Sequence, residues 1–223
     1  LEGWDPNYLK SKVVGAPSFY RVPGKGDTMV AFTENGELYL FNRRGELQTK
    51  SGVPIGEGFK QKLHFTNDSK SGMNQLVGVS SNGEIVRINF NGEVIYRNQL
   101  VRNDRDNEFL VIPSQDESDY VFISRQFTQV AVLDASESVL FETRASAEGL
   151  IYQYFNFGSN RKILAITDLI QNFCYLYDFQ GNLLTTMPLD SSGPIQITHQ
   201  SSKGQYLIRT INGRKLTEYL LAD

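Results

Sequence analysis

The segment GELYLFNRRGEL, Gly36–Leu47, decides the fold class. It begins with a run of aromatic and aliphatic residues, which favours a β-strand, and continues into a short polar turn that contains glycine. The same order of residues returns in GEIVRINFNGEV, Gly83–Val94. Short turns with glycine connect antiparallel strands. The segment therefore predicts an antiparallel hairpin that the chain uses more than once.

An internal repeat extends this pattern over most of the chain. The segments LYLFNRRGEL, IVRINFNGEV, VAVLDASESV and CYLYDFQGNL align without gaps. Their shared turn position falls at Gly45, Gly92, Glu137 and Gly181, which makes the repeat about 45 residues long. Repeats of this length are typical of β-propellers and other repeat arrays.

Each repeat contains four strand-like pieces joined by short loops, which favours a four-stranded antiparallel meander. A lone meander cannot bury both of its faces, and radial stacking of several meanders solves that problem. We therefore expect residues 1–223 to form a single all-β domain, a β-propeller-like fold of about five four-stranded antiparallel blades. The expected blades are 14–52, 59–101, 108–145, 150–189 and 193–223.

The fifth expected blade supplies only three strand-like pieces. We expect Tyr8–Val14 to complete it as a fourth strand, because a stable all-β protein needs to protect its sheet edges. The competing account is that these blades belong to a larger ring. The chain begins at Leu1 without methionine, which suggests a piece of a longer parent protein.

The repeat resembles the blades of β-propellers, in particular quinoprotein-like, NHL-like and YVTN-like repeats. The resemblance rests on an apolar strand, the Asn or Asp that follows it, and a turn glycine three positions further on in all but the third repeat; the Asn and Asp residues are Asn42, Asn89, Asp134 and Asp178. It implies a propeller segment of a bacterial protein that is periplasmic, surface-located or secreted. Quinoprotein blades usually carry a longer turn with Thr-Gly and a following tryptophan, and this chain has neither.

The net charge, the length of the apolar runs and the cysteine count exclude some kinds of partner and one kind of cross-link. The formal net charge is -3, and basic and acidic residues are interleaved, so we expect no nucleic-acid partner. No stretch approaches 18 consecutive apolar residues, so we expect no membrane contact from this segment. Cys174 is the only cysteine, which rules out an internal disulfide, and it lies in an apolar run typical of a core strand.

Three acidic residues, Asp104, Asp106 and Glu108, alternate in the segment RNDRDNE and offer oxygens that suit Ca²⁺. The EF-hand pattern fails, because Phe109 occupies the glycine position and Gln115 the position of the bidentate glutamate. We therefore expect a solvated loop and no metal site.

Four polar residues fall in the predicted first strands of their blades, which line the central channel of a propeller. They are the candidate channel-lining residues Arg21, His64, Tyr154 and His199. The predicted first strands, SFYRV, KLHFT, FLVIP, YQYFNF and IQITH, contain no Asp or Glu. General acid–base hydrolysis needs two placed carboxylates. We therefore expect no catalytic residues and no cofactor, so the protein is not expected to be an enzyme.

Two turns depart from the repeat pattern and indicate a candidate interaction surface. The other repeats cross from the second to the third strand with Asn-Gly turns, whereas the third and fourth use RQFTQ and TDLIQN. These place Phe127, Leu169 and Ile170 where polar residues stand elsewhere. One interpretation is that each side chain folds back onto its own blade or an adjacent loop; the other is an exposed patch that contacts a protein partner or another domain of the parent.

The function favoured by the sequence is a non-catalytic binding or structural module that acts as a scaffold for protein contacts. Two alternatives stay open. One is a glycan-directed hydrolase or lyase, which a ring of carboxylates at the channel mouth would favour. The other is a propeller that binds a small ligand or a cation in its central channel.

Overall fold

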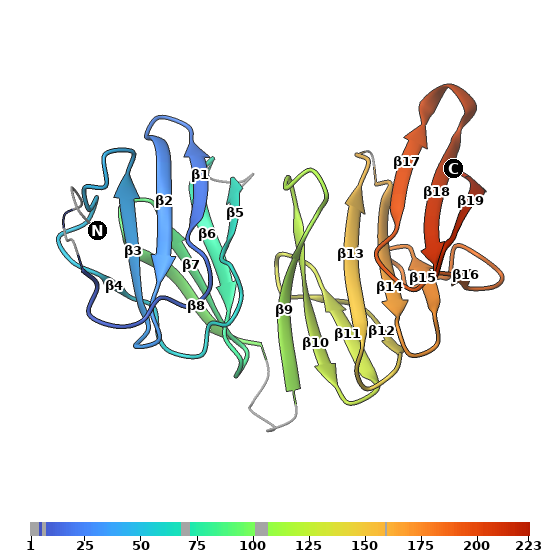
Figure 1. Ribbon diagram of the computed structural model, residues 1–223, viewed down its shortest axis with the longest axis horizontal. Helices are drawn as coiled ribbons and strands as arrows, with labels where there is room; N and C mark the ends of the chain where they lie inside the picture. Colours follow the sequence, from blue (N-terminus) through green and yellow to red (C-terminus); the bar gives the residue numbers. More distant parts are fainter. Residues whose placement is uncertain (1–4, 6–7, 68–71, 101–106, 159) are drawn as a thin grey trace. The chain divides into compact units, whose positions relative to one another are not determined.

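The protein is described by a computed structural model that covers residues 5, 8–67, 72–100, 107–158 and 160–223. Its regular structure is β-strand apart from one short 3₁₀ helix, Ser201–Lys203. The strands form five antiparallel sheets, in which each strand pairs with the next along the chain (Figure 1). This confirms the all-β, propeller-like meander architecture that the repeat predicts.

The chain forms two compact units, Leu1–Val111 and Ile112–Asp223. The expectation of one domain over 1–223 stays a prediction. In the first unit, two four-stranded sheets follow each other; their strands are β1 (Ser18–Val22), β2 (Gly26–Phe32), β3 (Glu37–Asn42) and β4 (Val53–Pro54), then β5 (His64–Asn67), β6 (Asn74–Val79), β7 (Glu84–Asn89) and β8 (Val94–Gln99).

Three further sheets follow, and the boundary between the units falls within the first strand of the third sheet. The third sheet contains β9 (Asn107–Pro113), β10 (Tyr120–Gln126), β11 (Gln129–Leu133) and β12 (Val139–Arg144). The fourth contains β13 (Leu150–Asn156), β14 (Lys162–Asp168), β15 (Phe173–Tyr177) and β16 (Leu189–Asp190). The fifth has three strands in the described part of the chain, β17 (Gln196–Gln200), β18 (Gln205–Asn212) and β19 (Lys215–Ala222).

The hairpin between the third and fourth strand-like pieces of the first four repeats has one turn geometry. In the first repeat, the Asn42 side-chain oxygen accepts hydrogen bonds from the backbone N–H groups of Arg44 and Glu46, at 2.9 and 3.0 Å. Asn89, Asp134 and Asp178 accept the equivalent pairs at 2.8 to 3.0 Å. A short Asn or Asp side chain stabilises a turn in this way because it satisfies N–H groups that the strands do not use.

The residue three positions after this Asn or Asp lies in the left-handed backbone region. Gly45, Gly92 and Gly181 have φ of 81°, 82° and 83°, as the repeat predicts. Glu137 occupies the same position with φ of 72°, a conformation that costs a residue with a Cβ of order 1–3 kcal/mol. The structure thus confirms the alignment of the repeats at the level of the backbone.

The turn glycine also permits close packing of neighbouring sheets within each unit. A Cβ on Gly92 would lie 2.4 Å from Cγ2 of Thr49, and one on Gly181 would lie 2.6 Å from Cβ of Phe141. Thr49 lies between β3 and β4, and Phe141 lies in β12, so each glycine meets the preceding sheet. Glycine is therefore needed there both for its backbone angle and for its lack of a side chain.

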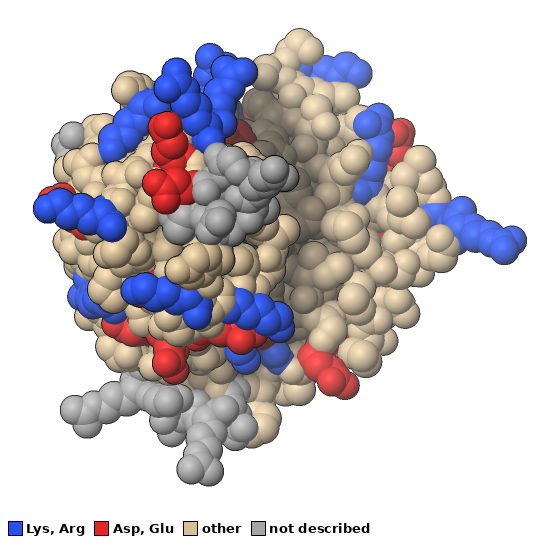
Figure 2. Space-filling model, turned by 60° about the vertical axis from the view of Figure 1, so that its left-hand side comes forward, with Lys and Arg blue, Asp and Glu red and all other residues tan. Residues whose placement is uncertain are grey.

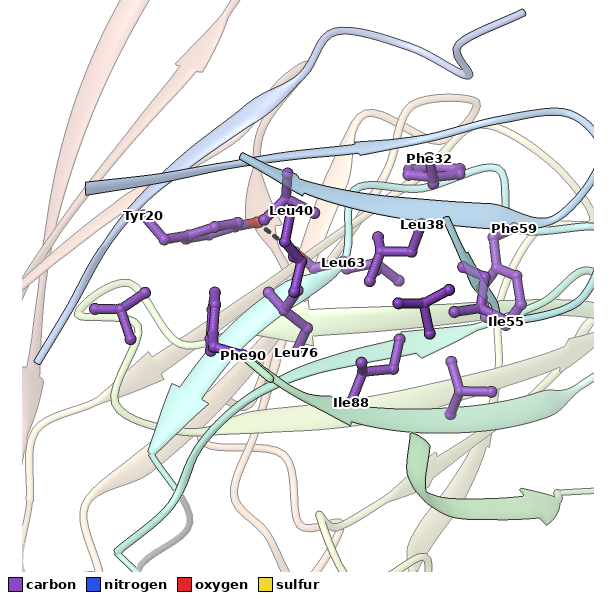
Figure 3. Close-up of a cluster of buried hydrophobic side chains, with 14 residues drawn as sticks. Tyr20, Phe32, Leu38, Leu40, Ile55, Phe59, Leu63, Leu76, Ile88 and Phe90 are labelled. Atoms are coloured by element: carbon purple, nitrogen blue, oxygen red, sulfur yellow. Dashed lines mark hydrogen bonds between the residues drawn. The ribbon is translucent and has the colours of Figure 1, made fainter. Parts of the chain in front are cut away.

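Between sheets, the cores are built from the apolar residues of the central strands. In the first unit, Leu38, Leu40, Leu76 and Ile88 are fully buried between sheets β1–β4 and β5–β8 (Figure 3). The second unit has a comparable cluster that includes Cys174, whose side chain is fully buried as predicted. Burial raises the pKa of the Cys174 thiol to about 11, so the thiol is protonated at neutral pH.

The prediction that Tyr8–Val14 completes the fifth sheet is wrong about the sheet with which this segment pairs. The backbone N–H of Val14 donates to the carbonyl of Phe32 at 2.8 Å, and that of Glu34 donates to the carbonyl of Lys12 at 2.9 Å. β1 pairs with β2 only as far as Val30, so Phe32 and Glu34 lie past the part of the chain that β1 covers. The N-terminal segment therefore continues the row of β1 in the first sheet, where the loop to be closed is short and costs little entropy.

We expect the dual role of Gly92 to make its replacement more costly than that of an isolated turn glycine. Gly92→Ala should lower the free energy of unfolding by about 2–4 kcal/mol, from the strained φ and the contact with Thr49. Gly24 also has a positive φ, 80°, but no atom lies within 4 Å of the place that a Cβ would occupy. Gly24→Ala should therefore lower the free energy of unfolding by only about 1 kcal/mol. Urea unfolding of both variants measures the difference, and equal losses would contradict the packing role.

Loss of the side-chain oxygen in the repeated turn should destabilise its hairpin. We expect Asn42→Ala to lower the free energy of unfolding by about 1–2 kcal/mol, because two backbone N–H groups lose their acceptor. Arg43 is exposed in the same turn, so Arg43→Ala is a matched control with an expected change below about 0.5 kcal/mol. Thermal unfolding of the pair tests this, and an unaffected Asn42→Ala variant would show that the cap is dispensable.

Candidate interaction surface and polar clusters

The apolar patch formed by Phe127, Leu169 and Ile170 is exposed in the structure. The relative exposures of these residues are 61%, 38% and 63%. Phe127 lies in the turn between β10 and β11, and the other two lie in the turn between β14 and β15. The three side chains are thus partly exposed, and Ile170 also lies against the adjacent loop, because a Cβ on Gly149 would be 3.4 Å from its Cγ1. A role of the patch in binding stays a prediction.

Phe127 has an unfavourable backbone conformation for an aromatic residue. Its φ is 51°, in the left-handed region, where the equivalent turns of the first two sheets place Gly36 and Gly83. A bulky residue with positive φ is an outlier that costs of order 1–3 kcal/mol. The chain thus carries an exposed aromatic ring at a position where glycine is more stable, and strain of this kind is typical of functional sites.

The turn that displays Leu169 and Ile170 is fixed by the buried carboxylate of Asp168. One carboxylate oxygen accepts the backbone N–H groups of Ile170 and Gln171, both at 3.0 Å. The other accepts the backbone N–H of Ser146 at 3.2 Å. Burial alone would raise the pKa of Asp168, but the hydrogen bonds from Ser146, Gln171 and Ile170 outweigh burial and lower it. The carboxylate is therefore ionised at neutral pH and holds the turn rigid.

The connection between β12 and β13 joins the two turns of the patch. The backbone N–H of Ala145 donates to the carbonyl of Thr128 at 2.9 Å, and that of Leu169 donates to the carbonyl of Gly149 at 2.8 Å. The guanidinium of Arg125 donates to the carbonyl of Ala147. Both turns are thus hydrogen-bonded to one intervening segment, which places Phe127 and Ile170 on the same end of their two sheets.

The candidate channel-lining residues of the first unit lie on first strands, as expected. Arg21 is exposed in β1, and His64 is buried in β5 with an exposure of 7%. The neighbouring Tyr20 donates its hydroxyl to the carbonyl of Leu63 and stacks on Phe65 at 5.7 Å. A channel-lining role for Arg21 and His64 stays a prediction.

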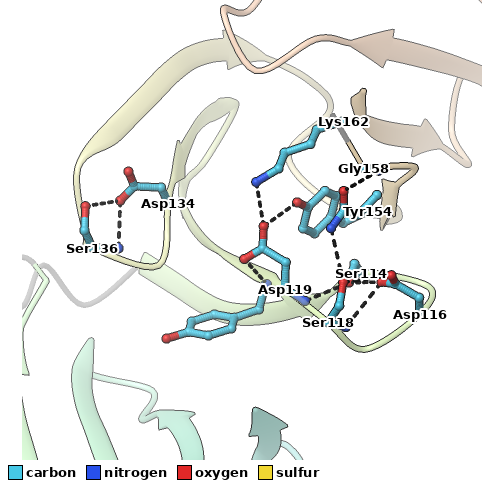
Figure 4. Close-up of polar contacts among 11 residues, drawn as sticks. Ser114, Asp116, Ser118, Asp119, Asp134, Ser136, Tyr154, Gly158 and Lys162 are labelled. Carbon is cyan, nitrogen blue, oxygen red and sulfur yellow. Dashed lines mark hydrogen bonds and ion pairs between the residues drawn. The ribbon is translucent and has the colours of Figure 1, made fainter. Parts of the chain in front are cut away.

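Tyr154, the third of these residues, belongs to a polar cluster in the second unit (Figure 4). Its hydroxyl donates to a carboxylate oxygen of Asp119 at 2.7 Å, and the Lys162 ammonium donates to the same oxygen at 2.7 Å. Burial of Tyr154 and its bond to Asp119 raise the pKa of the phenol, which is protonated at neutral pH. Burial opposes ionisation of Asp119, but Lys162 and Tyr154 lower its pKa overall. The cluster is a satisfied structural network.

His199 belongs to a separate cluster at the end of the last sheet. Its Nε2 lies 3.1 Å from a carboxylate oxygen of Asp223, which also meets the guanidinium of Arg161 at 2.8 Å. The Tyr206 hydroxyl donates to the second oxygen at 2.9 Å. That bond from Tyr206 is the largest cause of the lowered pKa of Asp223. Tyr154 and His199 therefore share no partner in these clusters.

Metal-ligating and catalytic groups are sparse in the part of the chain that the structure describes. No group of three or more His, Cys, Asp or Glu side chains that could hold a metal ion occurs there. Asp104 and Asp106 lie outside the described residues, whereas Glu108 lies in β9. Because β9 begins two residues before the predicted FLVIP, one first strand does contain an acidic residue, which corrects the sequence-based expectation.

Charge on the visible surface is mixed. On the face that Figure 2 shows, several basic side chains gather at the top, and acidic side chains lie directly beside them. No helix of the described residues is long and apolar enough to cross a membrane.

The sequence patterns did not identify Asp168, which supports the patch. A signal was present, because an acidic residue directly before a turn is the arrangement that Asp134 and Asp178 use in the repeated hairpin. The patterns also did not identify an apolar face on the last sheet, although Leu216 and Leu220 in KLTEYLLA lie on one side of a strand.

Comparisons with known proteins bear on the fold alone. No protein-family model matches the sequence, and no curated protein sequence matches it. Among solved structures, BBS1N in complex with ARL6DN, soaked with mercury, matches over 95% of this chain at 13% identity and a TM-score of 0.54. The Mitotic Checkpoint Complex matches over 93% of this chain at 12% identity and a TM-score of 0.51.

These neighbours are β-propeller proteins, and the chain has a β-propeller-like fold. It spans 61% of the BBS1N chain that it matches and 65% of the matched chain of the Mitotic Checkpoint Complex. At such low identity the likeness extends to the fold and carries no activity.

The lowered pKa of Asp168 predicts a pH-dependent contribution to stability. A carboxylate whose pKa is lower in the folded state stabilises the fold at neutral pH, and this contribution is lost as pH falls below about 3.8 through the folded pKa. We expect Asp168→Asn to lower the free energy of unfolding by about 1–3 kcal/mol at pH 7, with a smaller difference from wild type near about pH 3.

Glu148→Gln is the matched control, because Glu148 is exposed in the adjoining loop. Urea unfolding of both variants at the two pH values measures the effect. A difference between wild type and Asp168→Asn that does not change with pH would show that the ionised carboxylate is not the stabilising species.

Proposed function

We propose that this protein is a non-catalytic protein-interaction module and that the patch of Phe127, Leu169 and Ile170 is part of its binding surface. The observation that carries the proposal is the combination of strain and exposure at Phe127, with φ of 51° and 61% of its surface exposed. Selection for stability alone favours glycine at such a position. A binding partner that buries the ring offsets the cost of the strain.

The architecture around Phe127 suits an aromatic anchor. Hot spots of protein interfaces are enriched in aromatic residues surrounded by contacts that exclude water. Leu169 and Ile170 supply adjoining apolar surface, and the Asp168 carboxylate keeps their turn in one conformation. A rigid surface loses little entropy on binding, so its exposed apolar area contributes efficiently to affinity. The partner is expected to present an apolar recess for the ring.

The neighbours with this fold provide secondary support. The BBS1N structure is a complex with ARL6DN, and another neighbour is the Mitotic Checkpoint Complex, so propellers of this shape occur in protein assemblies. In this proposal the partner is a protein or another domain of a longer parent chain. Resemblance of the turns to quinoprotein-like, NHL-like and YVTN-like repeats supports a bacterial envelope or secreted origin.

Substitution of the anchor separates a binding role from a structural one. Glycine adopts a positive φ without strain. For Phe127→Gly we therefore expect the free energy of unfolding to stay level or to rise by about 1 kcal/mol. The same change, and Ile170→Ser, should each weaken partner binding by at least about tenfold, as expected for a hot-spot residue. Val139→Ser is the control, because Val139 is 57% exposed on a strand away from these turns.

The measurement is affinity capture from an extract of the source cells, followed by calorimetry with the captured protein in purified form. Wild type and Val139→Ser should bind equally. If Phe127→Gly binds like wild type, or if it loses stability, Phe127 is not a binding anchor and the proposed surface is wrong.

A further inference from the structure

The last sheet, β17–β19, buries only one of its faces in the described part of the chain. Along its central strand β18, Tyr206, Ile208 and Thr210 are buried, whereas Leu207 is half-buried and Arg209 and Ile211 are exposed. By contrast, β14 in the preceding sheet is buried at each position from Ile163 to Asp168. Burial with a period of two shows a sheet that is covered on one side.

On β18 and β19 the uncovered side is apolar at both ends and charged in the middle, whereas β17 adds the polar residues Gln196, Thr198 and Gln200. We call it the outer face; its cross-strand pairs are Leu207 with Leu220, Arg209 with Glu218, and Ile211 with Leu216. Leu220, Leu216 and Ile211 have exposures of 66%, 62% and 52%. Nε of Arg209 lies 2.7 Å from the Glu218 carboxylate, so an ion pair separates the two apolar pairs.

Leucine and isoleucine are among the residues most often buried in folded proteins, so a sheet face that exposes several of them is a candidate contact surface. In the first unit the chain covers one face of sheet β1–β4 itself, since Leu9 and Leu47 pack on the buried Met29, Tyr39 and Phe41. Within the described residues of the second unit, Leu216 and Leu220 stay more than half exposed. The residue types of the outer face are therefore those of an interface.

We propose that the outer face binds the outer face of a second copy of this chain. Its pattern is complementary to itself. A two-fold axis parallel to the strands places Arg209 opposite Glu218 of the partner subunit, and each apolar pair opposite the same pair of the second copy. The interface then has apolar contacts at both ends and four alternating charges at its centre. This charge arrangement favours one register, which is the main contribution of polar groups to an interface.

The oligomeric state of the purified protein tests the proposal. Wild type should form dimers in sedimentation velocity experiments up to roughly 100 μM, a range that detects contacts of micromolar affinity. Leu216→Arg with Leu220→Arg should be monomeric over the same range with an unchanged melting temperature, because both side chains are exposed in the single chain. Val139→Arg, another exposed apolar residue on a strand, should dimerise like wild type.

Charge reversal tests the orientation and guards against a folding defect. Arg209→Glu makes the centre of the outer face entirely acidic, and Glu218→Arg makes it entirely basic, so each variant alone should be monomeric. An equimolar mixture of the two should form a heterodimer, because opposite charges again face each other. Recovery on mixing requires both variants to be folded.

Monomeric wild type throughout this range would overturn the proposal, as would failure of the mixture to associate when both single variants are monomeric. Monomeric wild type is also the result expected if the outer face binds a sheet of another polypeptide. Phe127→Gly should dimerise normally, because Phe127 lies outside the outer face. Failure of the proposed partner surface and failure of the dimer are therefore separate outcomes.

Discussion

The fold depends on one small interaction, a side-chain oxygen that accepts two backbone N–H groups from its own turn. At Asn42, Asn89, Asp134 and Asp178 this interaction fixes the hairpin and sends the residue three positions later into the left-handed region. Where that residue is glycine, the turn has a surface flat enough for the preceding sheet to approach. Local turn chemistry thus sets the distance between neighbouring sheets, and the apolar strands fill the space that results.

The turns at the two ends of the hairpins differ in how much their sequences vary from repeat to repeat. The repeated turns are committed to packing, as the 2.4 Å approach between a built Cβ of Gly92 and Thr49 shows. The turns between second and third strands vary more in sequence, from Asn-Gly to the Phe127 turn and the Leu169–Ile170 turn. Two of their glycines are also closely packed, because a Cβ on Gly36 would lie 2.5 Å from the backbone of Gly56 and one on Gly83 would lie 2.9 Å from Cζ of Phe109. A rigid frame with variable turns at one end separates stability from binding. The unfavourable φ of Phe127 persists because the paired strands β10 and β11 hold the turn in place.

The sequence predicted the features that depend on local pattern. The repeat, the positive φ of Gly45, Gly92 and Gly181, the buried Cys174 and the five sheets all follow from turn chemistry and apolar runs. Features that depend on distant pairing were not predictable in this way. The sequence of residues 12–14 does not specify a partner strand, and only the three-dimensional structure shows that the backbone groups of Phe32 and Glu34 pair with them. Asp168 was missed because its partners, Ser146 and Gln171, come from two different loops.

The cluster of Asp119, Tyr154 and Lys162 and the apolar patch lie at opposite ends of the same two sheets, and their energetics differ. Asp119 stands at the start of β10, where Tyr154 and Lys162 satisfy its carboxylate, whereas Phe127 follows the other end of that strand. In this partly buried network the hydroxyl of Tyr154 and the charges of Asp119 and Lys162 satisfy one another, so it needs no ligand for its stability. An exposed ring on a strained backbone is the reverse, since it gains free energy from any partner that covers it. The two ends of these strands therefore differ in kind, because one carries paired polar groups and the other carries exposed apolar side chains.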